Sequence, residues 1–549
     1  MNLRPYQRTA SDSVFTAWAD SVSALAVMPT GTGKTVLAAD VARRVFPKRT
    51  MFLAHRKELI YQARDKMKSF ARLSCDVEMG DQRADLSQGF FSRAFVVVSS
   101  IQTQCAGGDG GGRMTRFDPM DFGCLIVDEA HHACSASYRR VIDYYRTNPD
   151  LRIMGITATP DRSDEAALGQ VFDVVAMDYE ILDAIHDGWL VPIEQQMVTV
   201  AGLDFSTIRT TAGDLNGADL AAVMENERNL HEMAGPSIDI IGNKRTLAFT
   251  SSVKHAEMLC EIFNRHRSGM AAWVCGKTDP KDRERILADF SSGRVQVVTN
   301  CGVLTEGFDN PGVEVILMGR PTKSRSLYAQ MCGRSTRPLA GIVDGIESAE
   351  DRRAAIAASP KPSCLIVDFV GNSGRHKLMT SADILGGNVS DEAVERAILK
   401  AKKEGKRINM SAALDEAEED IKREQEEKRL SDEARRSKLV AKARYNTQTV
   451  NPFDVLALTP TRERGWDTRK SLSEKQRGIL LKQGIDPDRI PYSQGKQLLN
   501  EIFSRWGAHK CTFKQAKLLQ KHGYPTDCSM EDAGKIIDAL AANGWRKPA

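Results

Sequence analysis

Short apolar runs, bounded by turn-forming or charged residues, predict buried β-strands along the first two thirds of the chain. Such runs lie within residues 22–27, 121–132, 151–160, 246–252 and 295–300. Helical stretches separate them, and strands that alternate with helices predict a parallel α/β sheet with its functional groups at the carboxyl ends of the strands. Because the alternation restarts near residue 240, we expect a second domain of the same kind.

The segment MPTGTGKT at 28–35 directly follows a predicted strand and precedes a helical stretch, the context that a phosphate-binding loop requires. Gly31 and Gly33 allow backbone N–H groups to curl around phosphates. Lys34 is placed to neutralise phosphate charge, and the Thr35 hydroxyl can hold Mg²⁺. The first position is methionine where the strict pattern has glycine, which leaves this cradle intact. We predict ATP contacts from Thr30, Gly31, Thr32, Gly33, Lys34 and Thr35.

A second segment, AAWVCGKT at 271–278, also ends in Gly-Lys-Thr. Its apolar strand runs straight to Gly276, so no glycine-rich loop remains to enclose a phosphate. We predict a strand end there, followed by a helix that starts near Pro280, and no nucleotide site.

Two acidic residues follow the apolar run in DFGCLIVDEAHH, residues 121–132. Asp128 is placed to hold Mg²⁺ through water, and Glu129 is placed to orient and deprotonate an attacking water. The pair lies roughly a hundred residues beyond the phosphate loop, a combination much more specific than either motif alone.

In the second predicted domain, SLYAQMCGRSTRP at 326–338 has Gln330, Gly333, Arg334 and Arg337 at QxxGRxxR spacing. Arginines three residues apart can share one helix face, and a pair of guanidinium groups suits recognition of a transferring phosphoryl group. Behind a complete phosphate site in another domain, this motif favours a composite ATP site.

The ordered set of motifs resembles that of superfamily 2 helicases. It runs LRPYQ (3–7), MPTGTGKT (28–35), FLAHRKEL (52–59), VVVSSIQT (96–103), DEAH (128–131), TATP (157–160), AFTSS (248–252), GFDNPGVEVI (307–316) and QMCGRSTR (330–337). LRPYQ, TATPDR and RPTKSRSLYAQMCGR are similar to the branch that contains RadD, XPB and type III restriction motors. The resemblance covers about residues 1–375. It implies two RecA-like domains in tandem, with ATP and Mg²⁺ at their interface.

The resemblance also implies roles for individual residues. Gln7 would contact adenine, with Tyr6 and Arg4 nearby, and Arg337 would be the arginine finger. The remaining assignments fall into three sets. His131, Thr157 and Thr159 would couple hydrolysis to domain movement; Gly307, Asp309 and Arg334 would lie at the nucleotide interface; and His55, Arg56, Gln102, Thr103, Thr250, Ser251 and Thr299 would line the nucleic-acid track. We count Lys34, Asp128, Glu129, His131, Arg334 and Arg337 as catalytic, and Gln330 as part of the ATP site.

The eleven cysteines are scattered and none forms a CxxC pair, so no zinc or iron–sulfur site is predicted. The related RadD-type proteins carry a cysteine-rich zinc module after the motor, and this sequence departs from them there. No apolar run approaches the ~20 residues needed to cross a bilayer, and the first ten residues lack the core of a signal peptide. We therefore expect a cytoplasmic protein with no membrane partner.

Beyond the motor, residues 391–445 are rich in Glu, Lys, Arg and Ala. The part from Ser411 to Arg444 predicts one helix of about 50 Å, and its sparse apolar positions favour a solvated spacer over a dimerising coiled coil. From Ala441 to the end, 19 Lys/Arg stand against 11 Asp/Glu, although the whole chain carries only +4. A basic tail suggests a nearby polyanion.

The tail contains an internal repeat whose copies are offset by 39 residues, and each copy predicts two short helices. One copy is too small to bury much core, so we expect the two to pack together. Lys475 and Lys482, and Lys514, Lys517 and Lys521, form one stripe on the first helix of each copy. DNA phosphates or a protein partner are the alternatives for these stripes. For Trp506 and Trp545 the alternatives are packing anchors and platforms on which bases stack, and we expect packing anchors.

The expected domains are 1–195 (RecA-like domain 1), 196–239 (connecting segment), 240–385 (RecA-like domain 2), 386–449 (charged helical linker) and 450–549 (helical repeats). The expected function is an ATP-dependent helicase or translocase on single-stranded or branched DNA, in repair, recombination or replication. An RNA helicase and the motor subunit of a restriction complex remain alternatives, because the motor motifs contact the backbone and the chain shows no nuclease constellation.

Overall fold

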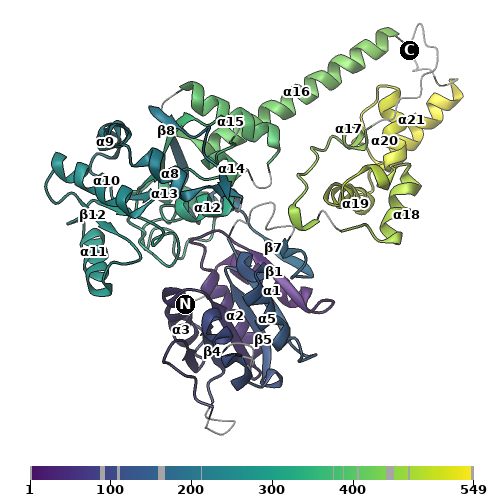
Figure 1. Cartoon of the computed structure of the whole chain (residues 1–549). Helices are drawn as coiled ribbons and strands as arrows, with labels where there is room; N and C mark the ends of the chain where they lie inside the picture. Colours follow the sequence, from purple (N-terminus) through teal and green to yellow (C-terminus); the bar gives the residue numbers. More distant parts are fainter. Residues whose placement is uncertain are drawn as a thin grey trace. The chain divides into compact units, whose positions relative to one another are not determined.

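The computed structural model describes residues 3–86, 93–107, 112–158, 167–211, 213–374, 376–386, 389–404, 407–439, 451–467, 470–543 and 545. Met1–Gly387 and Ala397–Ala413 form one compact unit, and Asn388–Arg396 and Leu414–Ala549 form another. Figure 1 labels the elements of both units. None of the described helices is long and apolar enough to span a membrane.

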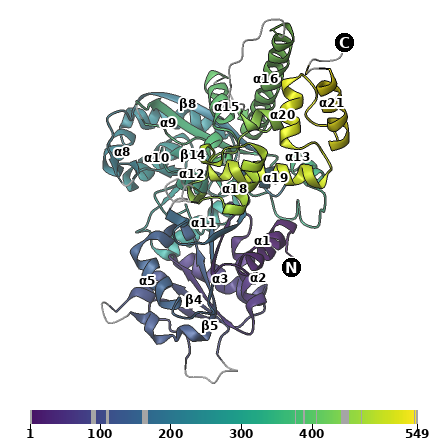
Figure 2. The same cartoon turned by 90° about the vertical axis from the view of Figure 1, so that its right-hand side faces the viewer.

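The first unit contains two seven-stranded sheets, as the sequence predicts. All strands of the first sheet are parallel, in the order β3-β4-β2-β5-β6-β1-β7. Its strands are β1 (Ser23–Val27), β2 (Arg49–Ala54), β3 (Cys75–Glu78), β4 (Val96–Ser100), β5 (Phe122–Asp128), β6 (Arg152–Thr157) and β7 (Val174–Asp178). Its helices are α1 (Pro5–Ala17), α2 (Lys34–Val45), α3 (Lys57–Ser69), α4 (Ile101–Cys105), α5 (Ala136–Tyr145) and α7 (Ile181–His186). In Figure 2, α5 lies on one side of β4 and β5, and α1 and α2 lie on the other.

The second sheet has the order β12-β13-β11-β14-β15-β8-β16, and only the short β16 is antiparallel. Its strands are β8 (Ile193–Asp204), β11 (Thr246–Thr250), β12 (Ala271–Val274), β13 (Val297–Asn300), β14 (Val315–Gly319), β15 (Cys364–Asn372) and β16 (Ile408–Asn409). Its helices are α8 (Gly217–Met224), α9 (Glu227–Ile241), α10 (Val253–His266), α11 (Pro280–Ser292), α12 (Arg325–Cys332), α13 (Ala349–Ala357) and α14 (Ser381–Leu385), with a small hairpin of β9 (Thr210–Thr211) and β10 (Asp214–Leu215). Strand β12 ends before Cys275 and α11 begins at Pro280, so the predicted elements around the second Gly-Lys-Thr are confirmed.

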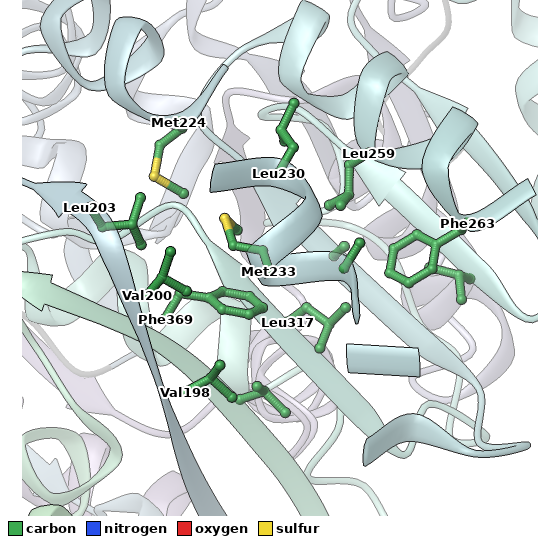
Figure 3. Close-up of a cluster of buried hydrophobic side chains, with 14 of the residues drawn as sticks. Val198, Val200, Leu203, Met224, Leu230, Met233, Leu259, Phe263, Leu317 and Phe369 are labelled. Atoms are coloured by element: carbon green, nitrogen blue, oxygen red, sulfur yellow. The ribbon is translucent and has the colours of Figure 1, made fainter. Parts of the chain in front are cut away.

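The expectation that residues 196–239 form a connecting segment is wrong. Strand β8 pairs with β15, and β8, α8 and α9 build the core of the second sheet's domain. Figure 3 shows Val198, Val200 and Leu203 of β8 in one cluster with Met224, Leu230, Met233 and Phe369. The boundary of the linker is corrected as well, because β16 adds residues 408–409 to the edge of the same sheet. The two helices there are α15 (Asp391–Glu404) and α16 (Met410–Leu439), the long helix that the sequence predicts.

The C-terminal repeats form a small all-helical domain. Its helices are α17 (Pro452–Leu456), α18 (Glu474–Gln483), α19 (Tyr492–Gly507), α20 (Phe513–Lys521) and α21 (Met530–Ala542). Each copy contributes two of them, as predicted, and Leu480 and Leu519 occupy equivalent places in one shared hydrophobic core. Gln476 and Gln515 complete capping boxes at the start of α18 and α20, which explains why both first helices begin where they do.

Candidate ATP site and nucleic-acid interface

The phosphate loop lies between the carboxyl end of β1 and the first residue of α2, Lys34. Gly31 and Gly33 have φ of 95° and 81°, a region that side-chain-bearing residues rarely adopt. A Cβ on Gly33 would lie only 2.5 Å from Nε2 of Gln7. Glycine is therefore required at Gly33 by the backbone conformation, and any side chain there would also displace the amide of Gln7.

The two acids lie where the sequence predicts, at the end of β5 beside the phosphate loop. Lys34 Nζ is 3.1 Å from Oε1 of Glu129, and the Glu129 amide donates to Oδ1 of Asp128 at 3.0 Å. Glu129 has φ of 48°, a left-handed conformation that is costly for a non-glycine residue and is typical of functional sites. Nδ1 of His131 lies 3.1 Å from Oγ1 of Thr157 on β6, which links the acids to the neighbouring strand. Thr159 lies outside the described residues.

Burial and charge set the protonation of these acids. Burial, and then the neighbouring Glu129, raise the pKa of Asp128 to about 7. For Glu129 burial acts in the same direction, but the ammonium of Lys34 and the charge of His131 outweigh it and lower the pKa. Of the two, Glu129 is thus the carboxylate held ionised, as a proton acceptor must be.

The second sheet's domain completes the cleft with two arginines. Arg334 is buried and donates to the carbonyls of Thr305 and Phe308. Cγ of Arg337 lies 3.0 Å from where a Cβ on Gly31 would be, so its side chain lies against the phosphate loop of the other domain. Burial lowers the pKa of both guanidinium groups to about 10, which leaves them charged at neutral pH.

A cavity of about 80 Å³ lies between these groups. Its walls are Thr30, Gly31, Gly33, Lys34, Thr35, Leu59, Gln62, Asp128, Glu129, Gly307, Phe308, Asp309, Arg334 and Arg337. Ligand pockets usually enclose about 300–1,000 Å³, so the domains must separate somewhat to admit a nucleotide. Lys34 pairs with Glu129 and Arg337 pairs with Asp309, each within one domain, so a bound phosphate would compete with these two carboxylates for the cations.

The N-terminal motif packs against the loop from the other side. The side chains of Tyr6 and Gln7 both donate to the carbonyl of Thr32, at 2.7 and 2.8 Å. Tyr6 also stacks on Tyr179, with ring centroids 5.0 Å apart. Arg4 lies over the ring of Trp189 and forms an ion pair with Asp344. Gln330 is buried on α12 and is not part of the cavity wall.

A buried ion-pair cluster, which the sequence did not predict, joins the two domains next to this cavity. Glu306 of the second domain forms ion pairs with His55 (Nε2 at 2.7 Å) and with Arg56 (Nε at 2.8 Å). Burial raises the pKa of Glu306, but the hydrogen bond and charge of His55 and the charge of Arg56 bring it down to about 2. Gln62 adds a hydrogen bond to the carbonyl of Gly307 at 2.7 Å. Two features of the sequence could have indicated this contact between the domains. One is the acidic residue immediately before Gly307, and the other is the pair Leu59 and Gln62, which are three residues apart and share one face of α3.

The ligand atoms of His55, His132 and Glu306 lie within 4.8 Å of one another, a spacing that could hold a metal ion. Arg56 already supplies a positive charge to Glu306 at 2.8 Å. We therefore assign this cluster to contact between the domains.

Several residues expected in the nucleic-acid track do not lie at a surface. Thr103, Thr250 and Thr299 are buried, and their hydroxyls bond to Ser100 and to the carbonyls of Asn300 and Ala256. Their side chains point into the packed domain, so a contact of these hydroxyls with nucleic acid stays a prediction. Gln102 donates to the carbonyl of His55, and Ser251 contacts the ring of His255.

Two known protein families match the residues of the two domains that form this cavity. Residues 1–162 match the family model for the type III restriction enzyme, res subunit, and residues 231–338 match the helicase conserved C-terminal domain. These two domains, together with the ATP-dependent helicases among its relatives, support a superfamily 2 helicase of the restriction-motor branch. The two matched regions carry the two halves of the cavity described above.

The chain is also similar to three curated proteins. It is 30% identical over 412 residues to "Putative ATP-dependent helicase IRC3" of Saccharomyces cerevisiae, covering 71% of this chain and 54% of that protein. It is 28% identical to "Putative mitochondrial ATP-dependent helicase irc3" of Schizosaccharomyces pombe, covering 73% and 62%. It is 23% identical to the type I restriction enzyme EcoAI endonuclease subunit of Escherichia coli, covering 57% and 41%. The matches thus span between two fifths and about three fifths of the length of these relatives.

Proposed function

We propose that the protein is an ATP-driven helicase or translocase that moves along DNA. The observation that carries the proposal is the position of Arg337. This side chain belongs to the second domain and lies against Gly31 in the phosphate loop of the first. A site assembled from two domains is sensitive to their separation, so that ATP binding and hydrolysis can drive domain movement.

Each residue of this site has a separate role in the proposed hydrolysis of ATP. Lys34 and the loop amides bind the phosphates, and Glu129 orients and deprotonates the attacking water. Arg337 stabilises charge that develops on the transferring phosphoryl group. The Thr35 hydroxyl and the buried Asp128 carboxylate fit a Mg²⁺ ion, which would supply charge neutralisation between the β- and γ-phosphates. The side chains of Gln7 and Tyr6 hold the loop and are placed for the adenine end of the nucleotide.

Three features support the coupling of turnover to movement. His131 connects the acids to Thr157 on β6, Arg334 fixes the loop that contains Gly307 and Asp309, and Glu306 joins the domains through His55 and Arg56. These contacts run from the catalytic acids to both faces of the cleft. A change at the γ-phosphate therefore has a connected route to the neighbouring domain.

The proposal is tested by steady-state ATP turnover of the full-length protein with single-stranded DNA, duplex DNA and RNA, each over a range of concentrations. DNA should stimulate turnover well above the basal rate, and Lys34→Ala should abolish both rates. Stimulation by RNA alone would assign the chain to RNA, and activity that needs an added restriction subunit would assign it to such a complex. Turnover unaffected by every nucleic acid would overturn the proposal.

A further inference from the structure

The C-terminal domain has surface features that its own packing does not explain. Nine positions are identical between residues 473–506 and 512–545, and several of them have clear structural roles. The glutamines cap helices, the leucines fill the core, and Gly484 and Gly523 have φ of 81° and 71°. Asp488 and Asp527 form ion pairs, and Gly495, which is Gly534 in the second copy, packs against Leu472. The lysines and tryptophans remain, and both copies keep them at Lys475/Lys514, Lys482/Lys521, Lys496/Lys535 and Trp506/Trp545.

The tryptophans are exposed, so the expectation that they are packing anchors is wrong. Trp506 is 38% exposed and Trp545 is 49% exposed, whereas Trp18, Trp189 and Trp466 are buried. Trp506 contacts the exposed Phe503 with ring centroids 5.5 Å apart. Each exposed indole leaves apolar surface in water and adds little to the packing of the domain. Because both copies nevertheless have tryptophan at this position, the residue indicates a binding role.

The lysines of α20 form a continuous cationic stripe. Lys514, Lys517 and Lys521 are exposed, are spaced i, i+3 and i+7, and have no acidic residue on their helix. Within the part of the chain that the structure describes, no ion pair is formed by these three or by Lys475 and Lys482 of α18. The buried residues of α20, Phe513, Ala516 and Leu519, lie on a different face. The stripe is therefore free to hold anions along its length.

An aromatic stack lies at the end of this stripe. His522 follows Lys521 directly, and its ring stacks on Trp545 with centroids 5.9 Å apart and an angle of 29°. Burial, and then the charge of Lys521, lower the pKa of His522, which keeps its ring neutral at neutral pH. Phosphate-binding cations beside an exposed aromatic face are the pair of features with which proteins hold unpaired bases.

We propose that the C-terminal repeats bind single-stranded nucleic acid, with phosphates along Lys514, Lys517 and Lys521 and an unpaired base on the Trp545–His522 stack. In the first copy, Lys475, Lys482 and the exposed Trp506 offer a smaller second contact, because Gly478 and Gln483 stand where the second copy has Lys517 and His522. A duplex fits less well, because its bases are already stacked and cannot cover an indole. The proposal extends the proposed function, because it gives the protein a second binding site for the single strand that the motor produces or moves along.

The test measures binding of a labelled oligo(dT) by the full-length chain as a function of salt concentration. Each phosphate contact on a single strand contributes about 0.7 to the log–log salt slope. The triple variant Lys514→Gln/Lys517→Gln/Lys521→Gln should therefore bind more weakly, with a slope lower by about 2. Trp545→Ala should weaken binding by roughly 5- to 150-fold with the slope unchanged, and Trp545→Phe should restore most of the loss.

A matched control removes three charges elsewhere. Lys402→Gln/Lys403→Gln/Lys422→Gln changes exposed lysines of α15 and α16 and should leave both affinity and slope near those of the unmodified protein. Basal ATP turnover should be the same in all variants, because none of the substitutions touches the ATP site. Blunt duplex DNA, measured in parallel, should be insensitive to Trp545→Ala.

The outcomes separate this proposal from the proposed function. If oligo(dT) stimulates ATP turnover but the tail variants keep the affinity and slope of the unmodified protein, the tail proposal fails and the surface is left for a protein partner. Equal losses in the control triple variant would also overturn it. If the tail variants lose binding although no nucleic acid stimulates turnover, the tail proposal stands and the motor assignment fails.

Discussion

Replacement of Arg337 by alanine should slow ATP hydrolysis greatly while leaving ATP affinity nearly unchanged. The guanidinium lies against Gly31, and its pKa of about 10 keeps it charged at pH 7.5. An arginine that meets charge developing in the transition state typically contributes about 10³–10⁵ in rate. That factor corresponds to about 4–7 kcal/mol of transition-state stabilisation.

The assay is single-turnover hydrolysis together with equilibrium binding of a fluorescent ATP analogue. Arg337→Lys keeps the charge but loses the planar, two-pronged donor geometry, so it should recover only part of the rate. Arg353→Ala is a matched control, because this exposed arginine donates to the carbonyl of His186 and does not line the cavity. Weakened ATP binding with an unchanged maximal rate in Arg337→Ala would refute the reasoning and leave Arg337 a ground-state contact.

Three further predictions concern other parts of the motor. Glu129→Gln should keep ATP binding and block hydrolysis, because the cradle around Lys34 is untouched; near-normal turnover would remove Glu129 from its role. Glu306→Ala removes the carboxylate that pairs with both His55 and Arg56, and it should lower the free energy of unfolding, measured by urea titration, by about 1–3 kcal/mol. An unchanged free energy of unfolding would show that the cluster is not stabilising. Burial lowers the pKa of His255 to about 3 from 6.5, so protonation favours the unfolded chain. This histidine alone should lower the free energy of unfolding by about 1.4 kcal/mol per pH unit between pH 6.5 and about 3, and His255→Gln should differ from the unmodified protein by that contribution.

The sequence predicted the motor's local elements well because the signals for them are local. Strands such as β1 and β5 are continuous apolar runs, and the glycines of the phosphate loop occupy backbone conformations that other residues avoid. The acids at the end of β5 fell beside the loop because parallel strands end at one edge of a sheet. The position of Arg337 followed from the order of the motifs.

The errors came from contacts that are distant in sequence. Strand β8 joins the second sheet by pairing with β15, more than 160 residues later, and nothing within 196–239 reveals that partner. The motif that contains Thr250 identifies the segment but not the direction of the side chain, which bonds inward to the carbonyl of Asn300. Trp545 was expected to be buried because tryptophan usually is, whereas the helices of the repeat leave its ring half exposed.

The central claim is that ATP hydrolysis between the two domains moves the protein along DNA. Streptavidin displacement from the end of a biotinylated strand, followed in parallel with ATP turnover, measures that movement directly. The unmodified protein should displace streptavidin only with ATP, at a rate that follows turnover, and Glu129→Gln should bind the strand without displacing anything. DNA-stimulated turnover with no displacement from either end of single-stranded or duplex substrates would contradict the account.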